Sequence, residues 1–173
     1  MNFVDEQLEI RETLSAAELV SAITEMWHTT DHGITEELSL QYPQFIQDLL
    51  HIADFDSACN WNGLEYFVKA NDHRGFLGTI AAFERCGYID GVRLLCEIGE
   101  KDDVRKRHET GKGRLGKNTL ALIQKIEPSL YYQQEDTKFW NLVESYVENT
   151  CGNGYNCICA NASQTTTLTN NVS

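Results

Sequence analysis

The sequence of 173 residues contains no long apolar run. Charges interrupt its longest apolar stretches within a few residues, whereas a membrane-spanning helix needs about 20 mainly apolar residues. The N-terminal stretch carries Asp5, Glu6 and Glu9 where a secretory signal would carry positive charge. We therefore expect a cytoplasmic protein without an export or membrane segment.

Basic residues are almost absent from the first third of the chain. Residues 1–60 contain twelve Asp and Glu against one base, Arg11, whereas residues 101–127 contain four acids and eight bases. The net charge of the chain is −12. A surface of this sign repels nucleic acid and anionic lipid and accelerates the encounter with a basic partner. We therefore expect a basic protein as the partner, with no direct binding of nucleic acid or membrane.

Alternating strand-like patterns are nearly absent, and helical periodicity dominates. A chain of this length with 42% hydrophobic residues can bury one core. The sequence therefore predicts an all-α fold, a single-domain bundle of about seven to nine helices over residues 1–150. Residues 151–173 are rich in Asn, Thr, Ser and Gly, and we expect them to form a poorly structured tail.

Capping signals predict where two early helices begin. Ser15 and Glu18 form a capping box, in which each side chain satisfies a backbone N–H of the other, and it opens a helix that should end near Gly33. Pro43 suits the first turn of a second helix, because its missing N–H would have no partner there. That helix should continue through Ile52 with one buried face.

Further helices are predicted downstream, separated by glycine and proline. Asn62–Gly63 interrupts the pattern, Gly87 should end one helix as its C′ residue, and Asp136 should cap the last helix. The basic, glycine-rich stretch 101–117 is expected to be a loop. The predicted helices cover Leu64–Val68, Phe76–Cys86, Ile89–Ile98, Leu115–Ile126 and Phe139–Val147.

Two short motifs point to ligands, and each has a simpler explanation. His28 and His32 have a spacing that a metal can use, but Gly33 follows and favours two exposed histidines at a helix end. Gly111–Asn118 comes within one residue of a phosphate-binding loop, with Asn where Ser or Thr would hold magnesium. That motif requires a buried strand before it, and Val104–Glu109 is too charged to form one. We therefore predict a basic loop, no metal and no cofactor.

The six cysteines fall into two groups. Cys59, Cys86 and Cys96 lie within apolar helical patterns, where a free thiol behaves as a small hydrophobe in a reducing compartment. The tail contains a C-x5-C-x-C cluster, and three thiols without a neighbouring histidine are not a standard zinc site. A disulfide and free thiols both remain open for this cluster. Its members are Cys151, Cys157 and Cys159.

The stretch Cys59–Phe67, followed by Asn71, resembles the central signature of a bacterial all-helical family of DNA-mimic proteins, typified by a neisserial member. The segment Phe76–Tyr88 is similar to the next helix and turn of that family, so the likeness covers about residues 40–100. Many relatives have Gly where Leu64 stands and Gln where Glu65 stands.

The signature also has a physical interpretation that needs no family. Asn62–Gly63 can supply a cap and a permissive backbone at a helix start, and Trp61, Tyr66 and Phe67 are large enough to anchor a core. We therefore expect the signature to be scaffold and the acidic residues to be the working surface.

The resemblance implies that surface carboxylates imitate the phosphates of duplex DNA and occupy the DNA-binding surface of a bacterial helix-turn-helix transcription factor, which then cannot bind its operator. Duplex DNA carries one charge per 1.7 Å of axis, so twelve net charges match roughly 20 Å of duplex, and a homodimer would suit a two-fold repressor. The carboxylates assigned to this surface are Glu6, Glu9, Glu12, Glu18, Glu25, Asp31, Glu36, Glu37, Asp48, Asp54 and Asp56.

Two alternatives stay open. Relatives of this family also resemble immunity proteins, in which an acidic helical domain neutralises a basic toxin. A small enzyme with a cleft between helices is the other alternative. No Ser, Cys or Thr lies in a glycine-framed nucleophile elbow, so we do not expect an enzyme.

Overall fold

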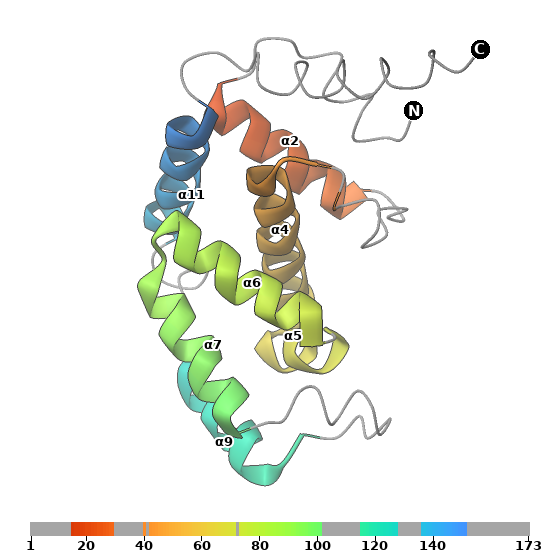
Figure 1. Cartoon of the computed structure of the whole chain (residues 1–173). Coiled ribbons are helices and arrows are strands. Elements are labelled where there is room, and N and C mark those ends of the chain that lie inside the picture. The colour runs from red at the N-terminus through yellow and green to blue at the C-terminus, as the bar shows by residue number, and fades with distance from the viewer. Residues whose placement is uncertain are drawn as a thin grey trace, which may run out of the picture.

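Helices make up almost all of the described part of the chain. The computed structural model describes residues 15–29, 40, 42–71, 73–101, 115–127 and 136–151, and over these residues it contains seven helices and no strand (Figure 1). The predicted all-α fold is therefore confirmed. The helices are α2 (Ala16–Thr29), α4 (Gln44–Asn62), α5 (Leu64–Ala70), α6 (His73–Cys86), α7 (Ile89–Lys101), α9 (Lys117–Ile126) and α11 (Asp136–Cys151).

The capping box predicted at the start of α2 is present. The backbone N–H of Ser15 donates to Oε2 of Glu18 at 2.8 Å, and the backbone N–H of Glu18 donates to Oγ of Ser15 at 3.3 Å. The Ser15 hydroxyl donates to the same carboxylate oxygen at 2.8 Å. These bonds satisfy N–H groups that a helix start leaves without intrahelical partners. The end predicted near Gly33 lies outside the described residues.

Two glycines set the turns on either side of the central helices. Gly87, with a φ of 82°, follows α6, and its N–H donates to the Glu84 carbonyl while the N–H of Tyr88 donates to the Phe83 carbonyl. This is the Schellman arrangement, and it confirms Gly87 as the C′ residue. Gly63, also at a φ of 82°, separates α4 from α5 as the Asn62–Gly63 prediction required.

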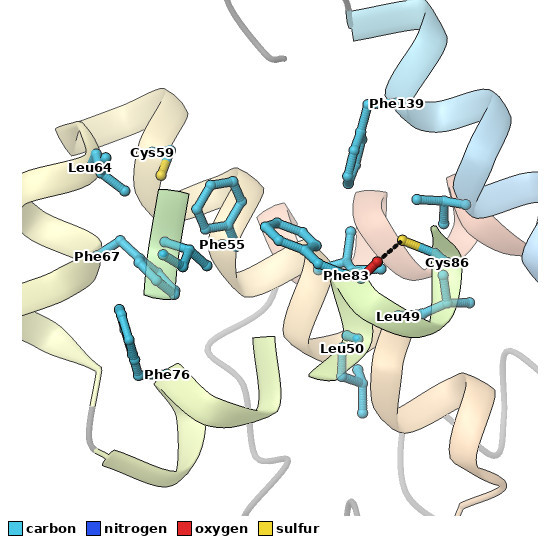
Figure 2. Close-up of a cluster of buried hydrophobic side chains, with 14 of the residues drawn as sticks. Leu49, Leu50, Phe55, Cys59, Leu64, Phe67, Phe76, Phe83, Cys86 and Phe139 are labelled. Atoms are coloured by element: carbon cyan, nitrogen blue, oxygen red, sulfur yellow. Dashed lines mark hydrogen bonds between the residues drawn. The ribbon is translucent and has the colours of Figure 1, made fainter. Parts of the chain in front are cut away.

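The core is centred on α4, which packs against α2, α5, α6 and α11. Pro43 lies immediately before this helix, and its carbonyl accepts the N–H groups of Ile46 and Gln47. Edge-to-face rings join the helices: Phe55 of α4 meets Phe67 of α5 at 4.9 Å and Phe83 of α6 at 5.0 Å between ring centroids (Figure 2). Such pairs contribute about 0.5–1.5 kcal/mol each beyond the area they bury.

The aromatic network continues to α11 and α7. Phe139 of α11 meets the ring of Phe83 at 5.6 Å and that of Tyr88, in the α6–α7 turn, at 4.9 Å. A Cβ on Gly91 would collide with the Tyr88 ring. The first turn of α7 can therefore pack this closely against the ring only with a glycine at position 91. The helix α7 then packs against α6 and α9, and α9 reaches back to α5.

Three residues expected in the core lie on the surface. Trp61 is 75% exposed and Tyr66 is 48% exposed, so of the three signature aromatics only Phe67 anchors the core. On α5 the buried side chains are Leu64, Phe67 and Val68, and Tyr66 falls off that stripe. Cys96 is likewise exposed beside the buried stripe of α7, whereas Cys59 and Cys86 are buried as predicted.

Three further sequence expectations concern segments outside the described residues. They are the basic loop between α7 and α9, the Cys157 and Cys159 thiols, and the tail beyond Cys151. Within the described ranges, no helix has both the length and the apolar character needed to cross a bilayer.

Candidate partner-binding surface

The eleven carboxylates predicted to face a partner separate into three groups. Glu18 and Glu25 are exposed on α2, whereas Asp48, Asp54 and Asp56 lie on α4 in buried or half-buried positions. The remaining six lie outside the described residues. They are Glu6, Glu9, Glu12, Asp31, Glu36 and Glu37.

The exposed side of α2 carries carboxylates and no base. Glu18 and Glu25 are seven residues apart, about 10 Å along the helix axis. Ser21 lies between them and donates its hydroxyl to Oε1 of Glu25 at 3.3 Å. The other side of the helix, with Leu19 and Ile23, is buried in the core. The packing of α2 therefore fixes which of its faces a partner can reach.

Asp48 does not belong to the partner surface, contrary to the prediction. Its side chain is fully buried and accepts two hydrogen bonds from Arg85, from Nε at 2.7 Å and from Nη2 at 2.6 Å. The Tyr146 hydroxyl donates to it at 2.6 Å and the Gln44 amide at 3.0 Å. This carboxylate joins α4, α6 and α11, and its charge is neutralised inside the protein.

The Asp48 cluster also changes the titration of its partners. The hydrogen bond to Asp48 raises the pKa of the Arg85 guanidinium above its usual range. Burial, followed by the hydrogen bond to Asp48, raises the pKa of the Tyr146 hydroxyl. Arg85 thus stays charged and Tyr146 keeps its proton at neutral pH, so both continue to donate hydrogen bonds to the buried Asp48 side chain.

Asp56 is a second correction, because its side chain is buried and accepts a hydrogen bond from the Asn60 amide at 2.9 Å. Asp54 is half-buried and accepts from the Asn71 amide at 3.0 Å. That bond ties the residue after α5 back to the middle of α4. Asp54 therefore connects α4 to the end of α5 through Asn71 of the signature, whereas the Asp56 bond lies within α4.

The glycine of the signature is required by its backbone and by a neighbour. Gly63 has φ 82° and ψ 166°, a region that is essentially restricted to glycine. A Cβ there would lie 2.9 Å from Oε1 of Glu127, and the same oxygen accepts the N–H of Leu64 at 2.7 Å. The Glu127 carboxylate thus satisfies an N–H at the start of α5 from the end of α9, which no local capping pattern in the sequence reveals.

Two acids that the sequence analysis did not select lie on α11, the helix that packs against α2. Glu148 is exposed and Glu144 half-buried, four residues apart on α11, which packs against α2. Figure 1 shows the C-terminal end of α11 next to the N-terminal end of α2. We call Glu18, Glu25, Glu144 and Glu148 the α2–α11 acidic surface. Glu144 and Glu148 are four residues apart, a spacing that places two side chains on the same face of a helix and could have been found in the sequence. The sequence analysis did not select them because they lie outside the acid-rich residues 1–60.

The two buried thiols, Cys59 and Cys86, are not suited to nucleophilic or metal chemistry. Burial raises the pKa of the Cys86 thiol to about 11, and burial together with Glu127, Asp56 and Asp54 raises that of Cys59 still further. Both therefore remain protonated at neutral pH, and the thiolate is the reactive form. Within the described residues, no three His, Cys, Asp or Glu side chains come together as a metal site. The His28–His32 and tail-cysteine hypotheses depend on side chains outside that part.

Over the described residues, the protein is all-α, with exposed carboxylates on α2 and α11 and an internal ion-pair cluster around Asp48. Comparisons of the chain with protein-family models, with curated proteins and with solved structures found no match. The resemblance to the DNA-mimic family therefore stays a prediction from the sequence of about residues 40–100.

Proposed function

We propose that this protein is an acidic DNA mimic that binds the DNA-binding surface of a helix-turn-helix transcription factor and keeps it from its operator. The observation that carries the proposal is the exposed face of α2, which presents Glu18 and Glu25 on a helix without Lys or Arg. It lies within the segment 1–60, where twelve acids stand against one base. Lys and Arg side chains that normally bind phosphates would pair with these carboxylates.

The spacing of the α2 carboxylates is compatible with this role. Phosphates of one DNA strand advance 3.4 Å along the axis, so the separation of about 10 Å corresponds to about three base-pair steps. Glu148 and Glu144 on the adjoining α11 widen the negative surface beyond a single line. The six assigned acids outside the described residues stay part of the prediction, and in this proposal a homodimer presents the surface twice.

The partner can be identified by affinity capture with a matched pair of variants. The wild-type protein is immobilised and incubated with host-cell lysate at low salt, and captured proteins are eluted with a salt gradient and identified by mass spectrometry. A basic DNA-binding protein should elute, and its operator DNA should compete with the capture. Glu18→Gln/Glu25→Gln should weaken capture about two- to thirtyfold, since exposed charge pairs contribute about 0.2–1 kcal/mol each.

The control variant removes the same charge elsewhere. Glu97→Gln/Glu100→Gln neutralises two exposed carboxylates of α7, away from the α2–α11 acidic surface. If this variant weakens capture as much as the α2 variant, only the net charge matters and the assigned surface is wrong. Capture of a secreted toxin domain instead of a DNA-binding protein would replace the proposal with the immunity function.

A further inference from the structure

A second exposed feature lies at the other end of α4, away from α2. The described residues expose five large apolar side chains, and only two of these are aromatic: Trp61 in the last turn of α4 and Tyr66 in the first turn of α5. They flank Gly63, and we call this turn with its two aromatics the α4–α5 corner. Figure 1 shows α2 across the N-terminal end of α4 and α5 at its C-terminal end.

Backbone hydrogen bonds and buried side chains fix the turn of the α4–α5 corner against the core. The N–H of Gly63 donates to the Cys59 carbonyl at 2.9 Å, and Leu64, directly after it, is fully buried. The Glu127 carboxylate fixes the N–H of Leu64 from α9, and Phe67 anchors α5 in the core. Exposed aromatic side chains on a base that is already ordered lose little further conformational entropy on binding, which is a property of interface hot spots.

The electrostatic environment of the corner is negative. The 19-residue helix α4 ends at the corner and has no basic residue in its last turn. The partial negative charge at the C-terminus of α4 is therefore not offset by a basic side chain of the same helix. The charged groups that act on the nearby Cys59 thiol are all carboxylates, those of Glu127, Asp56 and Asp54. The base on α5, Lys69, is bound to Glu65 within the same helix.

We infer that the α4–α5 corner binds an arginine-bearing segment of a protein partner, with Trp61 as the main contact and Tyr66 beside the turn. A guanidinium stacks on an aromatic face and at the same time donates hydrogen bonds to carbonyl oxygens, and the end of α4 offers Trp61 beside the last carbonyls of the helix. Lysine, a compact and strongly hydrated cation, would gain less from the ring. The inference does not use the α2 carboxylates, which lie at the other end of a helix about 28 Å long.

The test uses short peptides with capped termini, Gly-Arg-Gly-Arg-Gly and its versions with lysine or with citrulline, the uncharged counterpart of arginine. Binding is followed by NMR at the indole N–H of Trp61, one of three tryptophans in the chain, which Trp61→Phe assigns. The arginine peptide should shift this resonance, the lysine peptide should bind more weakly, and the citrulline peptide should bind weakest. Trp61→Leu, which keeps an apolar side chain but lacks the indole, should weaken arginine-peptide binding about two- to fivefold, and in this variant binding is followed at the backbone N–H groups of Gly63 and Leu64.

Two control variants make the outcome decisive. Leu77→Ala removes an exposed apolar side chain of α6 and should leave arginine-peptide binding unchanged. Glu18→Gln/Glu25→Gln should leave the Trp61 shift unchanged, so that failure at α2 and failure at the corner are distinguishable. Equal binding of the citrulline peptide, unchanged binding by Trp61→Leu, or loss of the Trp61 shift in the α2 variant would each overturn the inference.

Discussion

Glu18 and Asp48 belong to the same acid-rich third of the chain, yet they have opposite structural roles. Glu18 lies on the outer side of α2, where it completes a capping box and remains accessible. Asp48 lies inside, bound by Arg85 of α6 and Tyr146 of α11. The comparison shows that a count of charges along a sequence does not give the charge of a surface, because a buried carboxylate with its own arginine contributes almost nothing outside.

The largest effect should come from removing the internal carboxylate. Asp48→Ala leaves Arg85 and the Tyr146 hydroxyl without their acceptor, and breaking a buried pair in this way costs about 3–5 kcal/mol. We expect about 3 kcal/mol, the lower end, because the Arg85 side chain is 39% exposed and water can partly solvate it. The free energy of unfolding from urea titration measures the loss.

The matched exterior variant is Glu25→Ala, which should change the free energy of unfolding by less than about 0.5 kcal/mol. Tyr146→Phe should lie between the two, because it removes one hydrogen bond to a charged group, a loss of about 1.5–3 kcal/mol. If Asp48→Ala and Glu25→Ala lowered the free energy of unfolding by equal amounts, the assignment of Asp48 to the interior and Glu25 to the exterior would be contradicted.

A second, smaller effect is expected at the α4–α5 turn. Gly63→Ala must place a Cβ in a glycine-only region and 2.9 Å from the Glu127 carboxylate, which should cost about 1–3 kcal/mol. Gly116→Ala is the control, since Gly116 has a φ of −63° and a Cβ there meets nothing closer than 3.8 Å. Thermal unfolding should separate the two variants by several degrees, and identical midpoints would contradict the described turn.

The alkaline stability of the protein should depend on its buried thiols. Burial raises the pKa of Cys86 from 9.0 to about 11, so the unfolded chain loses this proton at lower pH than the folded chain. The contribution of this thiol to stability is complete below pH 9 and declines as pH rises to about 11, by on the order of 2 kcal/mol. Urea titrations at several pH values should show a shallower decline for Cys86→Ala. The exposed Cys96→Ala should behave as wild type.

Local patterns in the sequence predicted the helices well, and long-range contacts decided the rest. The Ser15–Glu18 box and the Gly87 C′ position each depend on residues within five positions, so the sequence alone reveals them. The Asp48–Arg85 pair spans 37 residues and the Leu64–Glu127 bond spans 63, and neither leaves a periodic signal.

The exposed aromatics were mispredicted for a related reason. A large ring is usually buried, and the signature gave no indication that Trp61 and Tyr66 lie off the buried stripes of α4 and α5. The packing of α4 and α5 against the rest of the core determines that Phe67 is buried while Trp61 and Tyr66 are exposed. The surface position expected for the assigned carboxylates therefore holds at Glu18 and Glu25 and is wrong at Asp48 and Asp56, and their role toward a partner stays a prediction.

The most direct test of DNA mimicry is the salt dependence of the complex with the captured transcription factor, measured beside that of the operator DNA. Dissociation constants are determined by titration from low to physiological salt. Affinity for the protein should fall with added salt, less steeply than affinity for DNA, because a protein releases fewer condensed counterions, and the two ligands should exclude each other. An affinity that is indifferent to salt, or a ternary complex with operator DNA, would contradict the proposal that the α2–α11 acidic surface replaces DNA.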